Sequence, residues 1–191
     1  MCVSRVRVDT KTEIRKVALE LFAQQGFDRT SLREIAERLD ITKAALYYHY
    51  PSKNDLLRAI VTPLADDLRA LVERHGPDPQ DGEPLANPKA LLYDYFDVCV
   101  RHSAMLIAVI NDVGALSRSG LIEVLLDRRL RLDALLGGGG SHVSDRLGAV
   151  IALGGIQDAA VLLSAEEVGA HRERVVGIAL AALEAGTSSM D

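Results

Sequence analysis

Positive charge and hydrogen-bond donors concentrate in the first third of the chain. Residues 1–62 hold eleven Lys and Arg against eight Asp and Glu, a formal charge of +3, whereas residues 63–191 hold eleven against nineteen, a charge of −8. Lys, Arg and Tyr side chains bind phosphate oxygens of nucleic acids, and a few groove-facing side chains distinguish the bases. The formal charge of −5 for the whole chain is therefore an average over a basic head and an acidic body, which indicates two separate tasks.

Short helices are expected to carry the donors of the head. An apolar stripe at helical spacing over residues 14–22 predicts a first helix that Gly26 ends. Ser31 and Glu34 have the spacing of a capping box that begins a second helix, and Thr42 can cap a third that runs to about Tyr48. Two short helices joined by a tight corner have the proportions of a helix-turn-helix unit, whose second helix enters the major groove of DNA.

The segment from Thr30 to Lys53, TSLREIAERLDITKAALYYHYPSK, resembles the DNA-binding domain of TetR-family (tetracycline-repressor-like) transcriptional regulators. The resemblance covers residues 12 to about 60. It implies a homodimer whose recognition helices enter successive major grooves of a palindromic operator. It also implies a C-terminal helical domain that binds a small-molecule inducer.

The same resemblance implies roles for individual residues. The positions that read bases or face the groove are Thr42, Lys43, Ala44 and Tyr47. The positions that meet the phosphate backbone are Thr30, Arg33, Tyr48, His49 and Lys53. Tyr47 and Tyr48 could instead pack between helices, and Arg33 could be a solvated helix charge. Asp40 and Ala44 stand where the family often has glycine. Asp tolerates the left-handed backbone conformation that the corner requires.

The rest of the chain predicts an all-α protein of about nine helices, because long segments keep the 3.6-residue period. We expect a helix-turn-helix DNA-binding domain over residues 1–52 and a helical ligand-binding and dimerisation domain over residues 53–191. A helix beginning near Ser52 should bend or break at Pro63. Residues 76–88 hold four of the six prolines and predict a surface linker.

The last two helices, over roughly residues 144–163 and 165–185, are expected to form the homodimer interface. Leu147–Leu163 is apolar nearly all round and so needs cover on several sides. Gln157 and Asp158 near its middle argue against a membrane span.

Candidate inducer contacts are polar or soft side chains scattered among apolar residues of the body, as ligand pockets are mostly apolar with a few polar groups. They are Phe96, Cys99, His102, Met105, Asn111 and Asp158. Each of them could equally be an ordinary core or surface residue.

Other function classes find little support. Two cysteines, Cys2 and Cys99, are too few for a disulfide framework, and the first residues lack the apolar segment of a secretory signal, so a cytoplasmic location is expected. We recognise no metal-ligand cluster, no cofactor motif and no catalytic grouping, so an enzyme is not expected. The leading hypothesis is an inducer-released repressor that binds double-stranded DNA. The alternative is a helical small-molecule-binding or protein-interaction dimer that does not bind DNA.

Overall fold

The computed structural model describes residues 9–76, 85–138 and 143–187, and over these ranges the chain forms eleven helices and no strand. The helices of the first half are α1 (Thr10–Gln25), α2 (Leu32–Arg38), α3 (Lys43–His49), α4 (Lys53–His75) and α5 (Pro88–Arg101). Those of the second half are α6 (Ser103–Asn111), α7 (Val113–Arg118), α8 (Leu121–Leu136), α9 (Val143–Leu162), α10 (Ala165–Ala170) and α11 (Arg172–Thr187). The all-α expectation is confirmed. The structure has two helices more than the expected nine, because α7 was not expected and the helix expected over residues 165–185 is divided into α10 and α11.

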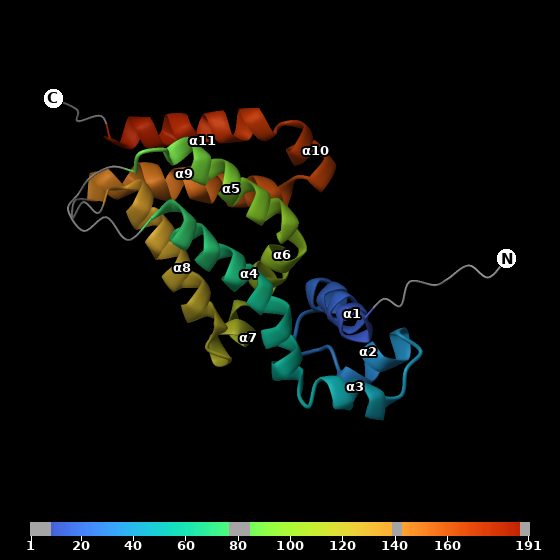
Figure 1. Cartoon of the computed structure of the whole chain (residues 1–191). Coiled ribbons are helices and arrows are strands. Elements are labelled where there is room, and N and C mark those ends of the chain that lie inside the picture. Colours follow the sequence, from blue (N-terminus) through green and yellow to red (C-terminus); the bar gives the residue numbers. More distant parts are fainter. Residues whose placement is uncertain (1–8, 77–84, 139–142, 188–191) are drawn as a thin grey trace.

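The helices are arranged in two parts (Figure 1). Helices α1–α3 form a small head at one end, and α9 and α11 lie side by side at the other, with α5 packed against both. Helices α4 and α8 lie between, and α4 packs against α1 of the head as well as α5 and α8 of the body. Helix α4 thus connects the two parts physically.

Several helix starts follow from single residues as predicted. The hydroxyls of Ser31, Thr42 and Ser52 accept from the backbone N–H three residues later and cap α2, α3 and α4. Ser164 forms a full capping box with Glu167 at the start of α10. The reciprocal half of the box expected at Ser31 is not formed, because the Glu34 carboxylate accepts from Gln25 Nε2 at 3.0 Å instead.

The backbone at two corners matches the residue types found there. Gly26 ends α1 with φ 86°, a conformation that glycine adopts without steric cost. Asp40 stands between α2 and α3 with φ 52°, so it adopts the left-handed conformation expected at the helix-turn-helix corner.

Of the bend or break expected at Pro63, the structure shows the bend. Pro63 does not break α4, which continues from Lys53 to His75, although Figure 1 shows the helix changing direction along its length. In α8, Leu126 and Leu130 are exposed, whereas Leu132 and Asp133 are buried. None of the described helices has the length and apolarity that a membrane crossing requires. Most of the expected linker over residues 76–88 lies outside the described residues.

Candidate nucleic-acid interface

Helix α3 presents a polar, exposed face at the end of the molecule farthest from α9 and α11 (Figure 1). Leu46 is fully buried and Tyr50 nearly so, and these two side chains hold α3 against the head core. The Tyr50 hydroxyl donates to the backbone carbonyl of Lys11 at 3.4 Å, and burial raises the pKa of Tyr50. The anchored side of α3 thereby fixes which residues face outward.

The residues expected to enter a groove do face outward. Thr42, Lys43 and Ala44 are exposed in the first turn of α3, and Tyr47 is 41% exposed. The Lys43 ammonium lies 5.4 Å from the centre of the Tyr47 ring, an exposed cation–π contact that a competing anion can displace. Thr42 serves the helix as well, because its hydroxyl accepts from the Ala45 N–H at 3.1 Å.

Tyr48 and Arg33 are available for contacts with phosphate. Tyr48 is 85% exposed, which excludes the alternative that it packs in the core. Arg33 is exposed and pairs with Glu37 at 2.7 Å, a solvent-accessible pair that is weak and easily exchanged. His49 is half-buried, and its Nδ1 is a buried atom without a hydrogen-bond partner among the described residues.

Two residues assigned to phosphate contacts by resemblance serve the head internally. Thr30 is 1% exposed, and its hydroxyl donates to the carbonyl of Gly26 at 2.8 Å. The Lys53 ammonium donates to the carbonyls of Phe27 at 2.7 Å, Asp28 at 3.3 Å and Thr30 at 2.8 Å. It also lies 4.2 Å from the centre of the Phe27 ring, and burial lowers the pKa of Lys53. Lys53 therefore ties the α1–α2 loop to the start of α4.

Residues of the body also form hydrogen bonds with this loop and with the end of α1. Asp112 accepts from the Phe27 N–H at 2.8 Å and caps α7 through the Ala115 N–H. Asn111 donates to the carbonyl of Ala23 at 3.2 Å, and so the predicted inducer contact Asn111 belongs to the joint between head and body. Arg118 forms two 2.8 Å bonds with the Asp28 carboxylate.

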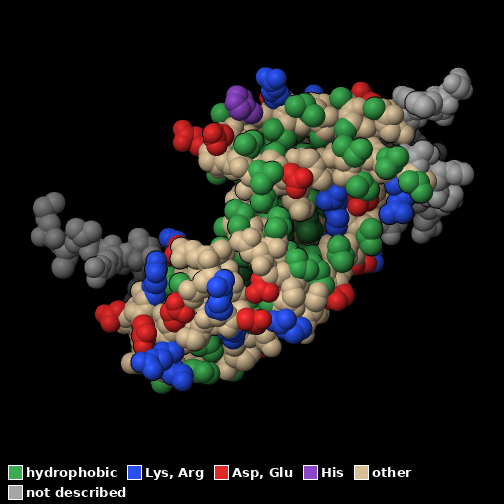
Figure 2. Space-filling view, turned by 180° about the vertical axis from the view of Figure 1, so that it is seen from behind, with side chains coloured by type: hydrophobic (Ala, Val, Ile, Leu, Met, Phe, Trp, Pro, Cys, Tyr) green, Lys and Arg blue, Asp and Glu red, His purple; other side chains and the backbone are tan. Residues whose placement is uncertain are grey.

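The candidate inducer contacts are not gathered in one cavity. A partly open cavity in the body has a volume of about 230 Å³ and is lined by Cys99 alone of the six predicted residues. Its lining residues come from α4, α5, α6, α8 and α9: Leu64, Leu68, Tyr95, Cys99, Leu106, Val109, Ile122, Leu125, Leu126, Arg129 and Gln157. In Figure 2 the back face of the molecule is hollowed between its two parts, and hydrophobic side chains border the hollow.

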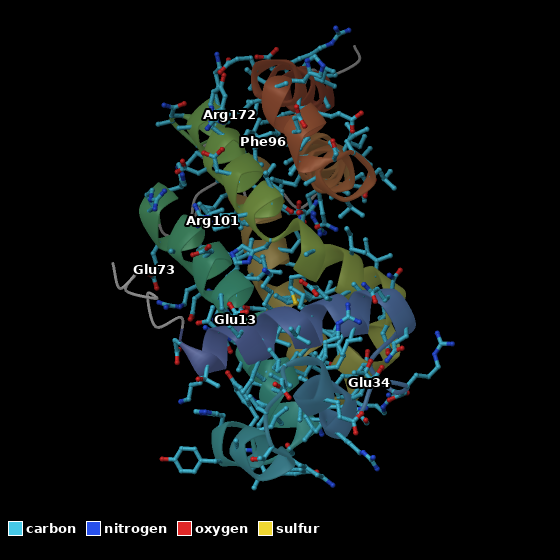
Figure 3. All side chains as sticks on the ribbon, turned by 90° about the vertical axis from the view of Figure 1, so that its right-hand side faces the viewer. Glu13, Glu34, Glu73, Phe96, Arg101 and Arg172 are labelled. Atoms are coloured by element: carbon cyan, nitrogen blue, oxygen red, sulfur yellow. The ribbon has the colours of Figure 1, made fainter. Side chains whose placement is uncertain are left out.

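The other predicted contacts are engaged elsewhere. Phe96 is buried beside α11, where the Arg172 guanidinium lies 5.8 Å from its ring centre, and the two side chains lie close together in Figure 3. Asp158 is exposed on α9. Met105 lines a more open groove between α1 and α4, together with His102.

His102 belongs to a paired arrangement between α4 and α5. Its Nε2 lies 2.8 Å from an Asp67 carboxylate oxygen that also accepts from Arg101 at 2.8 Å. The second set has the reverse polarity, with Asp94 of α5 bound to His75 and Arg74 of α4. The two helices carry the same spacing of Asp, Arg and His: Asp67, Arg74 and His75 on α4, and Asp94, Arg101 and His102 on α5. The hydrogen bonds of both sets lower the pKa of their Asp, and His102 thus joins α5 to α4 while also lining the open groove beside Met105.

Comparison with known proteins agrees with this geometry. Residues 14–60 match the family model of bacterial regulatory proteins of the tetR family. Over 52 residues the chain is 46% identical to the HTH-type transcriptional regulator AcrR of Shigella flexneri, a match covering 27% of this chain and 24% of that protein. Over 51 residues it is 41% identical to the negative transcriptional regulator IcaR of the biofilm operon icaADBC in Staphylococcus epidermidis, covering 27% of this chain and 28% of the relative.

Most of the chain shares its fold with a solved structure. A transcriptional regulator from Aquifex aeolicus superposes with a TM-score of 0.67 at 23% identity, covering 91% of this chain and 99% of that one. The sequence matches span only about a quarter of the curated relatives, so sequence similarity concerns the head and structural similarity concerns the fold. These relatives are named as transcriptional regulators, not enzymes, in agreement with the expectation from the sequence.

Proposed function

We propose that this chain, whose N-terminal domain belongs to the tetR family of bacterial regulatory proteins, is a DNA-binding transcriptional repressor that responds to a small molecule. The observation that carries the proposal is the exposed polar face of α3, held in place by the buried Leu46 and Tyr50. Lys43, Ala44 and Tyr47 would meet base edges in the major groove. The direction of regulation is supported by IcaR, the relative named a negative regulator.

Phosphate contacts would come from exposed residues around α3. Arg33 and Tyr48 are accessible, whereas Thr30 and Lys53 would act by shaping the loop that orients α2. Thr42 would keep α3 capped beside the groove, and His49 would lie at the end of the helix. The division into residues 1–52 and 53–191 stays a prediction, and we place α4 as the element common to both domains.

Salt dependence of binding tests the proposed interface. The full chain is titrated by fluorescence anisotropy onto a labelled mixed-sequence duplex at several salt concentrations. Affinity should fall steeply with salt, and Arg33→Gln should lower the slope of log K against log salt by about 0.9 for one lost phosphate contact. Arg69→Gln removes the same charge from the body, where Arg69 pairs with Asp66 and Glu73, and should leave the slope unchanged. A flat salt response, or equal effects of the two variants, contradicts the proposal and favours the alternative of a helical dimer that does not bind DNA.

The outer face of α9 and α11 supports a homodimer. On α9, Leu147 and Ile151 are 51% and 58% exposed at i, i+4 spacing, and Ile178 on α11 is 63% exposed. A second copy of this layer would cover these side chains and place two heads on one DNA duplex. Ala152 is only 1% exposed and packs inside the chain, so substitution there would test folding rather than dimerisation.

Sedimentation measures the proposed dimer directly. Ile178→Glu should yield monomers, because a pair of carboxylates in an apolar interface costs several kcal/mol. Val124→Glu is a matched control, since Val124 is 40% exposed on α8, away from the α9–α11 layer. If the Ile178 variant stays dimeric, the interface lies on another face.

A route from the cavity to the head supports the ligand response. Leu64 and Leu68 line the cavity from α4 directly after Pro63, and Leu106 and Val109 line it from α6. The end of α6, the N-cap of α7 and the last residue of α7 hold the end of α1 and the α1–α2 loop through the contacts described above. A ligand that fits the cavity better in one arrangement of α4 and α6 would shift the population of head positions. The repressor is released from DNA when that arrangement no longer fits both half-sites.

A further inference from the structure

The body cavity has one polar end and otherwise apolar walls. Seven leucine, isoleucine and valine side chains line it, and the polar groups are contributed by Tyr95, Cys99, Arg129 and Gln157. A cavity of about 150 Å³ holds benzene, so a volume of about 230 Å³ fits a compact ligand of about nine non-hydrogen atoms. The walls favour an apolar body for that ligand, because burial of apolar surface drives such binding.

The polar end is rich in donors. The Tyr95 hydroxyl donates to Gln157 Oε1 at 3.3 Å, which occupies the acceptor of that amide and leaves its NH₂ group as a donor. Arg129 donates through Nη1 to the Tyr95 hydroxyl at 3.4 Å and through Nη2 to the Val150 carbonyl at 3.2 Å. Both bonds are longer than the roughly 2.7–2.9 Å of a charge-assisted bond, so the guanidinium has stronger bonds available to it.

The charge of Arg129 is only partly balanced within the chain. Its Nε lies 3.2 Å from one oxygen of Asp133, a single contact rather than the two-bond pairing that a guanidinium and a carboxylate can form. Asp133 is 4% exposed, and burial raises its pKa, so the carboxylate is the member of the pair more readily neutralised. Arg129 itself keeps its charge at all ordinary pH values. A ligand cation is disfavoured at this end and an anionic acceptor is favoured.

We infer that the cavity binds a compact amphiphilic acid, whose apolar body lies between α4, α6 and α8 and whose carboxylate accepts hydrogen bonds from Arg129 and Gln157. The inference rests on the proposed function in treating this ligand as the regulatory one, but the binding itself requires no DNA. The ligand carboxylate replaces the Tyr95 hydroxyl and the Val150 carbonyl as the acceptor for the two Nη groups of Arg129. The contact between Arg129 Nε and Asp133 stays.

Titration calorimetry with three probes of one chain length tests the ligand class. Octanoate should bind the full chain with one-to-one stoichiometry. Octanamide, a neutral acceptor, should bind at least about tenfold more weakly, since bonds to charged groups are roughly twice as strong as neutral ones. Octylamine should not bind. Equal affinities for octanoate and octanamide, or tighter binding of octylamine, would overturn the inference.

Variants locate the site. Arg129→Gln combined with Asp133→Asn removes the charge without leaving a buried carboxylate unpaired, and should weaken octanoate at least about tenfold. Val109→Phe fills the cavity from α6 and should abolish binding. Arg128→Gln, on the next residue of α8, alters a side chain that pairs with Asp127 and should leave the affinity unchanged. Unchanged octanoate affinity in Val109→Phe would place the ligand elsewhere and overturn the inference.

The ligand class and the proposed function fail separately. Octanoate binding without DNA binding would support the inferred ligand class and contradict the proposed regulatory function. DNA binding without octanoate binding would support the proposed regulatory function and overturn the inferred ligand class.

Discussion

Replacement of Lys53 distinguishes two roles for this residue. The structure indicates internal hydrogen bonds to the α1–α2 loop, and the family resemblance implies a contact with phosphate. The Lys53 ammonium donates to three backbone carbonyls of the α1–α2 loop, those of Phe27, Asp28 and Thr30. Lys53→Met keeps the aliphatic stem against the Phe27 ring and removes the donor. The loop should then lose its tie to the start of α4.

The expected loss of stability follows from these bonds. A hydrogen bond to a charged group contributes about 1.5–3 kcal/mol. Lys53 is half-buried, so water can reach part of the vacated loop and replace some of what is lost. We therefore expect the free energy of unfolding to fall by about 2 kcal/mol, close to the contribution of one such bond. For a chain of 191 residues this corresponds to a drop of about 4–8 °C in the unfolding midpoint.

Thermal unfolding and the salt dependence of DNA binding are measured on the same variants. Lys53→Met should lower the midpoint and leave the salt slope unchanged at temperatures well below unfolding. Arg33→Gln, at an exposed position expected to meet the phosphate backbone, should do the opposite, with the midpoint unchanged and the slope lower by about 0.9. The reasoning is refuted if Lys53→Met lowers the slope by that amount and leaves the midpoint in place.

Three further changes test other parts of the structure. A Cβ at Gly148 would lie 2.7 Å from the Leu183 carbonyl, so Gly148→Ala should destabilise by about 1–3 kcal/mol in chemical denaturation, whereas Gly154→Ala, in open space, should be neutral or stabilising. The hydrogen bond from His102 lowers the pKa of Asp67. The free energy of unfolding of the native chain should therefore exceed that of Asp67→Asn by its full amount well above the ordinary pKa of 3.8, and the difference should vanish as the pH falls through the folded-state pKa. A difference that persists below that pKa would contradict the pairing. Pro63→Ala should leave the affinity for the operator nearly unchanged and reduce the change in that affinity that a bound ligand causes, as measured by anisotropy. If the ligand changes the affinity as much as before, the bend in α4 plays no part in the response.

Local features of the fold could be predicted because single residues determine them. The caps at Ser31, Thr42 and Ser52 depend on one hydroxyl and the next turn of backbone. The left-handed corner at Asp40 likewise depends on one residue type. The short α7 and the break between α10 and α11 were missed because six-residue helices hold too few apolar positions to show a period.

The partners of polar side chains could not be predicted, because residues far apart in the sequence supply them. Lys53 meets a loop 23 to 26 residues earlier, and His102 meets Asp67 35 residues earlier. Arg129 lies in a run of three arginines among four residues, where periodicity gives no signal for the one that faces the cavity. The sequence therefore predicted the residues exposed on α3, whereas Cys99 alone of the six residues predicted to contact an inducer lines the body cavity.

Selection from random duplex DNA with the full chain tests the central claim most directly. The account predicts recovery of an inverted repeat whose half-sites are centred about one helical turn, roughly 10 base pairs, or a multiple of it apart, as expected for a dimer with one α3 in each major groove. It further predicts that Tyr47→Ala changes the recovered half-site. Absence of any enriched sequence, or the same inverted repeat recovered by chains altered at both Lys43 and Tyr47, would contradict it.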